Sequence, residues 1–447
     1  MKRFTMIMGL MLIALVVLAA CGRNNDDREF GQAGWTPNDM EAATIRMAWW
    51  GGQARHDAME AALDIFRARY PHITIVTEHG DWGGGAWMDS TFIQIVGETE
   101  PDIMQVNYAW VHAFGLGTNV FLDLNTVSHI LNLNEWSQDM INMLTTSDGE
   151  LGAVPHGMTG RVMVYYRPLL EEFGLSSFPA TIDELINFGT RVAANNNAID
   201  DGNNRYAFWP IGPEALEIVL LQILYNLTGR TLQEGGQMLH SVAEVQQAFD
   251  ILQRMIDSGT IPSFHQQEPP HNASNPVWTE GRAGSAFEWV GNIFLTGDNV
   301  HGGGHRHNLG VALFPAVNGG TATMQRPSLA HAISNVTEHP ALAAYLLNFL
   351  YTDEGALRAI AHQLGVPASD TAARLAQQVG MVEGIQLTGA QLLADNPAVM
   401  CEFFENAALR VPRQILIQEF RLGEINSQQA AQRWVNEGQS ALDGLFN

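Results

Sequence analysis

The chain has 447 residues, which predicts two or three domains and allows a core large enough to hold the fold by burial alone. It carries 23 Lys and Arg against 47 Asp and Glu, so its formal net charge is −24 at pH 7. Such an acidic chain excludes proteins that bind nucleic acid or anionic lipid by electrostatic attraction.

The N-terminus is an apolar run behind two basic residues. Lys2 and Arg3 precede residues 4–20, and the run ends in the letters LAAC, of which the last is Cys21. A basic start before a short apolar segment is typical of a secretory signal, and the run is slightly short of the roughly 20 residues of a membrane span. Its end resembles the bacterial lipobox, where the signal is cleaved before a cysteine that receives a diacylglycerol. We expect residues 1–20 to be a signal peptide and Cys21 to be lipidated, with an uncleaved membrane anchor as the alternative.

The segment after the apolar run is polar. Residues 21–42 contain Gly and Pro and show no periodicity, which predicts a flexible tether. Cys401 is the only other cysteine of the chain. Because Cys21 is expected to carry a lipid, we expect no intramolecular disulfide, and we expect Cys401 to be a buried small side chain.

Strands and helices alternate in the first part of the body. β-branched and aromatic residues over 43–50 predict a strand, and apolar residues at helical spacing over 57–71 predict a helix. The same signals predict a second strand over 72–80, a helix over 87–101 and a third strand over 102–110. This order indicates parallel α/β layers.

The rest of the chain is predicted to mix short strands with long helices. A strand pair within 152–175 leads to a helix that ends at Gly174, and Thr181 with Glu184 has the spacing of a capping box. Further elements are expected in this order: helices over 214–260, strands over 283–294 and 307–316, a strand and a helical pair over 329–365, and helices from about 368 to the end. We expect no transmembrane span after residue 20 and find no internal repeat.

Eight stretches of the chain carry a resemblance to a known family. They are TIRMAWWGG, FRARYPHITIVTEHGDWGGG, EPDIMQVN, GAVPHGMTGRVMVYYRPLLEEFGLSSFPATIDEL, EGRAGSAFEWVGN, GVALFPA, HPALAAYLLNFLYTDEGALRAIAHQLGVPA and EINSQQAAQRWVNEG. In their order and spacing they resemble the extracellular solute-binding proteins of ABC transporters, specifically the sugar-binding, maltodextrin-type family. WWGGQARHD together with HGDWGGGAW is similar to members that bind plant-derived oligosaccharides.

The resemblance implies an α/β fold like that of type II periplasmic binding proteins, with two α/β lobes joined by hinge crossovers and a ligand cleft between them. The expected boundaries are 43–153 plus 314–365 for the first lobe, 154–313 plus 366–447 for the second, and crossovers near 153–155, 313–315 and 365–367. We expect an oligosaccharide to sit in the cleft, to be trapped by hinge closure and to be delivered to a membrane permease. The resemblance implies a monomer on the outer face of the cell membrane, without a cofactor, a metal or a nucleic-acid partner.

The candidate site residues follow from the strand ends. In open α/β sheets, ligands bind beyond the carboxyl ends of the strands. Aromatic rings pack on the C–H faces of a pyranose, and polar or charged side chains bond to its hydroxyls. The candidates are Trp50, Gln53, Arg55, His56, Asp81, Trp82, Asn107, Tyr108, Trp110, Thr159, Trp209, Glu288 and Trp289. In the family, the positions matching 107–110, Thr159 and the turn after Trp289 face the solute.

The candidate tryptophans have a second interpretation, because an aromatic residue in a strand is often part of a core. For Trp50, Trp82 and Trp110 the cleft is favoured over the core. Trp209 and Trp289 fit a core as well as a cleft. Trp49 is expected in the core, since it points to the opposite face of its strand from Trp50.

The charge of the solute is open at this point. Arg55 and His56 could pair with a carboxylate, so an acidic oligosaccharide such as a uronide is a hypothesis. Arg326, in the stretch MQRPSLAHAIS, is expected to be a surface cation rather than a ligand group.

Two other classes of protein remain as alternatives. A lipid-anchored glycosidase needs two carboxylates roughly 5–10 Å apart. Asp81 and Glu288 could form such a pair, although both also fit loop or capping charges, and the sequence has no G-x-S-x-G or HExxH motif. The other alternative is a binder of a non-sugar solute such as a polyamine. The histidines of HGGGHRHNLG lie among glycines, which favours a solvated loop over a zinc site.

Overall fold

The computed structural model describes residues 30–81, 86–115, 119–146, 148–199, 204–210, 215–263, 275–293, 306–360, 363–380, 384–401 and 403–446. The expected signal peptide, Cys21, the first part of the tether and Trp82 lie outside these residues. No helix in the described part of the chain is both long and apolar enough to cross a membrane.

The first lobe begins as the sequence predicts, with a parallel sheet. β1 (Ala43–Trp50) pairs in parallel with both β2 (Ile73–Gly80) and β3 (Ile103–Val106). α2 (Gln53–Arg69) connects β1 to β2, and α3 (Ala86–Val96) connects β2 to β3. The predicted strand over 102–110 is shorter in the structure, because Asn107 accepts a hydrogen bond from the backbone of Ala109 at 3.0 Å and so turns the chain into α4 (Tyr108–Gly115).

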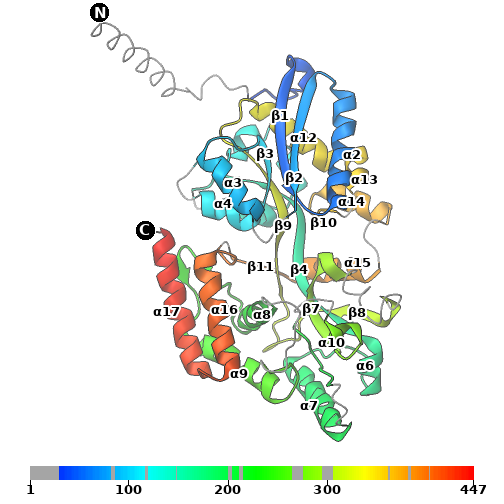
Figure 1. The fold of residues 1–447 in the computed structure, drawn as a ribbon, viewed down its shortest axis with the longest axis vertical. Helices are drawn as coiled ribbons and strands as arrows, with labels where there is room; N and C mark the ends of the chain where they lie inside the picture. The colour runs from blue at the N-terminus through cyan, green and yellow to red at the C-terminus, as the bar shows by residue number, and fades with distance from the viewer. Residues whose placement is uncertain are drawn as a thin grey trace, which may run out of the picture.

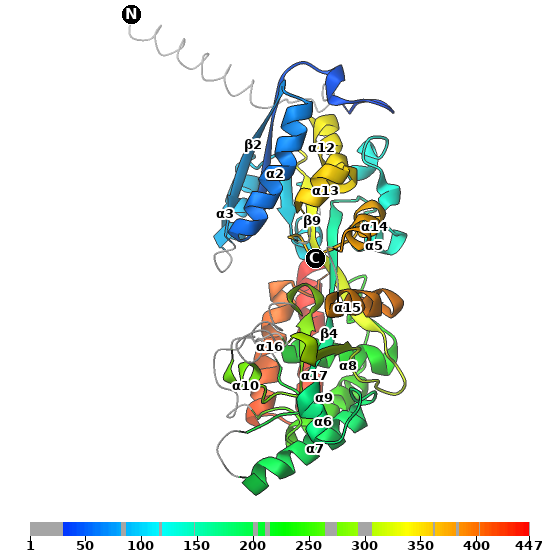
Figure 2. The same ribbon diagram turned by 90° about the vertical axis from the view of Figure 1, so that its right-hand side faces the viewer.

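Two long antiparallel strands run from the first lobe into the second. β4 (Val154–Tyr166) pairs with β9 (Thr323–Ile333) over 154–160 and then with β7 (Ser285–Trp289) and β8 (Leu309–Ala312) over 161–166. β9 also pairs with β3, so the main sheet has the order β10-β4-β9-β3-β1-β2. Both views show β4 and β9 passing between an upper and a lower lobe (Figures 1 and 2).

The remaining elements distribute between these lobes. The upper lobe also holds α5 (Gln138–Asn142), α12 (Pro340–Thr352), α13 (Glu354–Ile360) and α14 (Asp370–Gln378) (Figure 2). The lower lobe holds α6 (Arg167–Glu172), α7 (Ile182–Ile199), α8 (Ala215–Thr228), β5 (Gln233–Glu234), β6 (Gln237–Met238), α9 (Val242–Asp257), α10 (Pro276–Thr279), α15 (Gly384–Asp395), α16 (Ala407–Leu422) and α17 (Ser427–Phe446). β10 (Val366–Pro367) and β11 (Pro397–Val399) pair with β4 and β9 near the middle of the molecule.

Each lobe has its own apolar core. Trp49, as expected, is fully buried in the first core, together with side chains of α2 and α12. Trp434 of α17 is fully enclosed in the second core, against Phe249 of α9. The two cores share no residue, and burial of apolar area stabilises each by roughly 25 cal/mol per Å². The lobes are therefore separate packing units that β4 and β9 join.

The chain changes lobe later than the sequence indicates at two places. Phe314 and Met324 pack in the second core, whereas Leu329 and Ile333 pack in the first, so the second crossing runs along β9 and not at 313–315. After β10 the chain stays with the first lobe, because α14 packs on α12 and α13. It joins the second lobe in α15, which packs on β8 and β4. Apolar side chains on β9 and α14 decide both differences.

Candidate functional site

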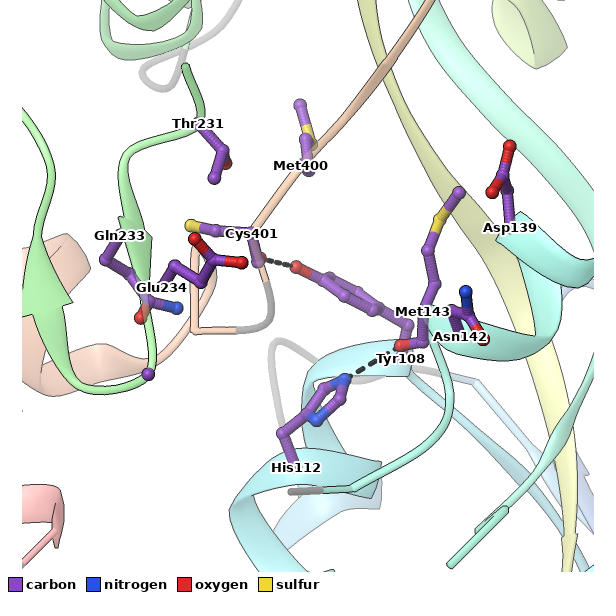
Figure 3. A pocket seen from close by; sticks show the side chains of 11 residues that line it. Tyr108, His112, Asp139, Asn142, Met143, Thr231, Gln233, Glu234, Met400 and Cys401 are labelled. Atoms are coloured by element: carbon purple, nitrogen blue, oxygen red, sulfur yellow. Dashed lines mark hydrogen bonds between the residues drawn. The ribbon is translucent and has the colours of Figure 1, made fainter. Parts of the chain in front are cut away.

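Tyr108 reaches from the first lobe to the second. Asn107 ends β3 and begins α4, which places Tyr108 directly beyond the carboxyl end of the strand. The Tyr108 side chain is fully buried, and its hydroxyl donates a hydrogen bond to the backbone carbonyl of Cys401, between β11 and α16 (Figure 3). Cys401 is buried, as expected. A residue at a predicted strand end therefore makes a direct contact between the lobes.

Arginine and aromatic side chains continue from Tyr108 into the second lobe. The Cζ atom of Arg326 lies 5.9 Å from the centre of the Tyr108 ring and 5.0 Å from that of the Trp289 ring. The Cζ atom of Arg161 lies 4.7 Å from the centre of the Trp289 ring. These are distances at which a guanidinium is attracted to the face of an aromatic ring. We call Tyr108, Arg326, Trp289 and Arg161 the inter-lobe stack.

The pairing of the hinge strands brings the stack together. Arg326 of β9 lies opposite Thr159 of β4, and Trp289 of β7 lies opposite Arg161 of β4. Because residues two apart on a strand share a face, Thr159 and Arg161 point to the same side of β4. The structure thus joins three candidates from the sequence, Tyr108, Thr159 and Trp289, through two arginines.

The two guanidiniums are largely shielded from solvent. Arg161 is 3% exposed and donates from Nη1 to the carbonyl of Phe287 at 2.7 Å. Arg326 and Glu405 each keep 11% of their side chains exposed and form an ion pair with 2.8 Å between Nη2 and Oε1. A buried charge is costly unless it is paired, so Glu405 offsets much of the cost of placing Arg326 here.

A cavity of about 290 Å³ adjoins Tyr108 between the lobes. The first lobe contributes Tyr108, His112, Asp139, Asn142 and Met143, and the second contributes Thr231, Gln233, Glu234, Gly235, Met400 and Cys401 (Figure 3). The Nε2 atom of His112 lies 2.8 Å from the carbonyl of Met143, which fixes this ring at the wall. The volume is close to the lower limit of ligand pockets, roughly 300 Å³.

Three further candidates gather at the carboxyl end of β1. The rings of Trp50 and Trp110 lie 5.3 Å apart at 37°, and both side chains are buried. Arg55 donates from Nη1 to the carbonyl of Trp50 and from Nε to that of Gln363, each at 2.9 Å. Burial lowers the pKa of the Arg55 guanidinium. These residues form a rigid aromatic wall with an arginine fixed by the backbone.

Gln53 and Asp81 are exposed next to this wall. Gln53 donates to the Asp57 carboxylate at 2.7 Å, within α2, and Asp81 directly follows β2. Both are accessible to solvent and lie apart from the hydrogen bonds and ion pairs of the inter-lobe stack among the described residues.

His56 and Trp209 are both buried, which for Trp209 agrees with the core alternative. His56 is buried, accepts a hydrogen bond from the indole of Trp49 at 3.1 Å and stacks on His79 with 4.2 Å between ring centres. Burial, with the neighbouring His79 charge, lowers the pKa of His56. Trp209 is fully enclosed in the second lobe beside Tyr206.

Glu288 also lies elsewhere than expected. It is paired with Val162, whose side chain belongs to an apolar cluster of the second lobe. Since neighbours on a strand point to opposite faces, Glu288 is on the other side of β7 from Trp289. Its carboxylate accepts a hydrogen bond from the Trp289 backbone at 2.7 Å. It is buried on the face of β7 that belongs to this apolar cluster.

The sequence prediction misses two arginines and one carboxylate of the site. Arg326 keeps only 11% of its side chain exposed and pairs with Glu405, so it is not a surface cation, and Arg161 is not among the candidates. A signal for Arg161 was present, because a charged residue within an apolar strand is seldom buried without a role. Glu405 carries no such signal. Within the described part of the chain, no group of three or more His, Cys, Asp or Glu could hold a metal ion.

The family of the chain follows from comparison with known proteins. Residues 52–357 match the family model of bacterial extracellular solute-binding proteins. A periplasmic solute-binding protein from Pectobacterium atrosepticum is 25% identical, with a TM-score of 0.78 over 91% of this chain and 100% of the other. A Yersinia enterocolitica oligogalacturonide-binding protein in complex with saturated digalacturonic acid is 22% identical, with a TM-score of 0.75 over 90% and 100%.

A third similar structure, maltose-bound MalE3 of T. maritima, is 18% identical, with a TM-score of 0.67 over 90% of this chain and 99% of the other. The similar structures are two-lobed binding proteins of type II, which confirms the fold expected from the sequence. The family comprises solute-binding proteins and not enzymes. This chain belongs to the bacterial extracellular solute-binding proteins, the type that serves ABC importers.

Proposed function

We propose that this protein captures a carbohydrate between its two lobes and delivers it to the permease of an ABC importer. The observation that carries the proposal is the inter-lobe stack, in which the half-buried Trp289 stands among arginine donors. An indole ring can pack on the C–H face of a pyranose, while guanidinium groups and the Thr159 hydroxyl bond to the oxygens around it. The similar structures from Yersinia and T. maritima contain digalacturonic acid and maltose, which supports a saccharide here.

Capture follows from how the lobes are joined. β4 and β9 serve as the hinge, because both strands belong to the first sheet at one end and to the second lobe at the other. Tyr108 lies on one side of the hinge and Trp289 on the other, so a rotation changes the distance between the walls of the site. A solute that touches both walls favours the closed form. The closed form then presents both lobes to the permease.

The experiment is a binding screen with the chain from residue 22 onward. Thermal shift and calorimetry test fragments of pectin, xylan, chitin and α-glucan, together with amino acids and spermidine. We expect one family of saccharides to raise the melting temperature by mass action and to be recovered unchanged by chromatography. Cleavage of the sugar favours a glycosidase. A shift with spermidine or an amino acid, and none with any saccharide, contradicts the proposal.

The proposal includes a lipid anchor and a monomeric, extracytoplasmic protein. Residues 1–20 are removed, and Cys21 carries acyl chains, each methylene contributing roughly 0.8 kcal/mol to membrane binding. In a Gram-positive host, Cys21→Ser moves the protein from the membrane fraction to the medium. Cys401→Ser is the matched control, because Cys401 is buried in the fold, and it stays with the membrane. Retention of Cys21→Ser on the membrane contradicts the lipid anchor.

A further inference from the structure

We propose that the solute carries a carboxylate, as an oligosaccharide of uronic acids does, and that Arg326 and Arg161 bind this group beside Trp289. The inference rests on the proposed function, since it names the class of carbohydrate for the same site. Its first support is the concentration of positive charge. Both guanidiniums lie within 5.0 Å of the centre of one indole ring, in a chain that has only 23 cationic residues against 47 acidic ones.

The second support is the hydrogen bonding of Arg326. Its Nη2 atom is paired with Glu405 at 2.8 Å, and its Nη1 atom donates to the carbonyl of Pro327 at 2.8 Å. Its Nε–H is buried and finds no acceptor among the residues that the structure describes. Buried donors are nearly always satisfied, so an acceptor is expected to arrive with the solute. A carboxylate is the acceptor that suits a guanidinium best.

The third support is the arrangement of neighbouring groups. Thr159 lies opposite Arg326 on the same face, so its hydroxyl can donate to the same anion. Glu288 faces the opposite side of β7 and leaves this face to the arginines. Glu405 neutralises Arg326 in the absence of solute, and Arg161 supplies a second guanidinium next to it.

Arg55 and His56, which the sequence suggested as partners of a carboxylate, are engaged elsewhere in the structure. Arg55 donates to two backbone carbonyls, those of Trp50 and Gln363, which occupy its Nε and Nη1 atoms. His56 is enclosed in the first core. Arg326 and Arg161 therefore replace Arg55 and His56 as the groups that meet the carboxylate.

The test changes the charge of the ligand first and of the protein second. Calorimetry compares digalacturonate and trigalacturonate with their methyl esters and with galactobiose. We expect the acids to bind at least 10-fold tighter than the esters, which is about 1.4 kcal/mol and the lower end of a charged hydrogen bond. Arg326→Gln and Arg161→Gln are each expected to lower this acid-to-ester ratio. Arg358→Gln is the matched control, since Arg358 pairs with Glu354 on the exposed surface of α13, and it keeps the ratio.

The outcomes distinguish a failure of the carboxylate proposal from a failure of the proposed carbohydrate binding. If the protein binds the acid and its ester with equal affinity, the proposal that it recognises a carboxylate is wrong, while carbohydrate binding stands. The same holds if neutral oligosaccharides of any family in the binding screen bind as tightly as the acids. No binding of any saccharide overturns the proposed function itself. If an arginine variant does not fold, as judged by circular dichroism, the acid-to-ester ratio of the parent protein still decides, because the esters leave the chain unchanged.

Discussion

Trp289 is central to both proposals, carbohydrate binding and carboxylate recognition, because two arginines contact its ring and the ring remains half-buried. We predict that Trp289→Ala weakens binding of the solute by about 1–3 kcal/mol, because the variant loses a stacking surface. Its melting temperature is also expected to fall, because the ring packs against the second core. Calorimetry with the best saccharide of the screen measures the change.

A second aromatic residue separates binding from stability. Phe173 packs on Phe188 inside the second lobe, with 5.8 Å between ring centres, and is half-buried like Trp289. Phe173→Ala is expected to lower the melting temperature and to keep the affinity. If Trp289→Ala binds as tightly as the parent protein, the solute does not stack on this ring.

For single residues, the sequence predicts whether a side chain is buried better than it predicts which residues the side chain contacts. Alternation correctly places Trp49 in the core, and the strand-end residue Tyr108 contacts the second lobe, while its role in binding stays a prediction. For His56, one turn into α2, the helix rotates the side chain onto Trp49 and His79, a contact that the strand-end position does not predict. Arg326 shows the converse, since its burial depends on Glu405, a residue remote in sequence.

Among the elements, β4 is constrained most tightly where it passes β9 and β10. Its pairing with β9 shifts register on both sides of Gly157. A Cβ atom added to Gly157 would lie 2.8 Å from the carbonyl oxygen of Val366 and 2.9 Å from that of Leu364. We predict that Gly157→Ala lowers the free energy of unfolding by about 1–3 kcal/mol, because the backbone must move.

Urea unfolding measures this effect, and α17 offers a matched glycine. A Cβ atom added to Gly444 meets nothing within 4 Å, so Gly444→Ala is expected to be neutral or slightly stabilising. An unchanged midpoint for Gly157→Ala shows that the three strands are not as close as described.

β4 and β9 also carry two buried histidines. The rings of His156 and His331 lie 5.7 Å apart, and His331 is 2.8 Å from the hydroxyl of Tyr351. Burial, with the charge of Arg55, lowers the pKa of His331 to about 3. Burial lowers the pKa of His156 well below its usual value, with smaller contributions from His331 and Arg55. The His331 imidazole is therefore neutral in the folded protein at pH 5, where it is mostly protonated in the unfolded chain.

The stability of the folded protein decreases as the pH falls. The lowered pKa of His331 leaves stability intact above about pH 6.5 and removes it as the pH falls toward 3, because only the unfolded chain then takes up a proton. Between pH 7 and pH 5 the uptake of this proton by the unfolded chain lowers the free energy of unfolding by about 2 kcal/mol through His331. We predict that His331→Gln unfolds in urea with a smaller loss of free energy between these two pH values than the parent. His307→Gln, at an exposed position, keeps the loss of the parent, and an equal loss in all three proteins contradicts the assignment.

At the scale of elements, local signals predict which segments are strands and helices, but not where they cross between lobes. The stretch LFPA suggests a crossing at its proline, yet Phe314 packs in the second core and β9 makes the passage. The reason is that a crossing is decided by which core the apolar side chains enter. That depends on pairing with β3 and β4, which lies far along the chain.

For the whole molecule, the order of elements and the family resemblance together predict the two-lobed fold, which the similar structures confirm. The site is predicted only in part, because its contacts join the two lobes. Tyr108 and Cys401 are 293 residues apart, and no local pattern relates them. The register of β4 with β7 and β9 creates the inter-lobe stack, and register is a property of the folded sheet.

The same construction predicts a change of shape on binding. The cores share no side chain, so rotation about β4 and β9 does not require either lobe to repack. We predict that a saturating saccharide lowers the radius of gyration in small-angle X-ray scattering, because the ligand contacts both walls and stabilises the closed form. Trp289→Ala, at the same sugar concentration, is expected to show a smaller decrease in radius, because less of the variant is bound. A parent protein that is saturated by calorimetry and yet unchanged in radius binds its solute without closing, and β4 and β9 are then connections and not a hinge.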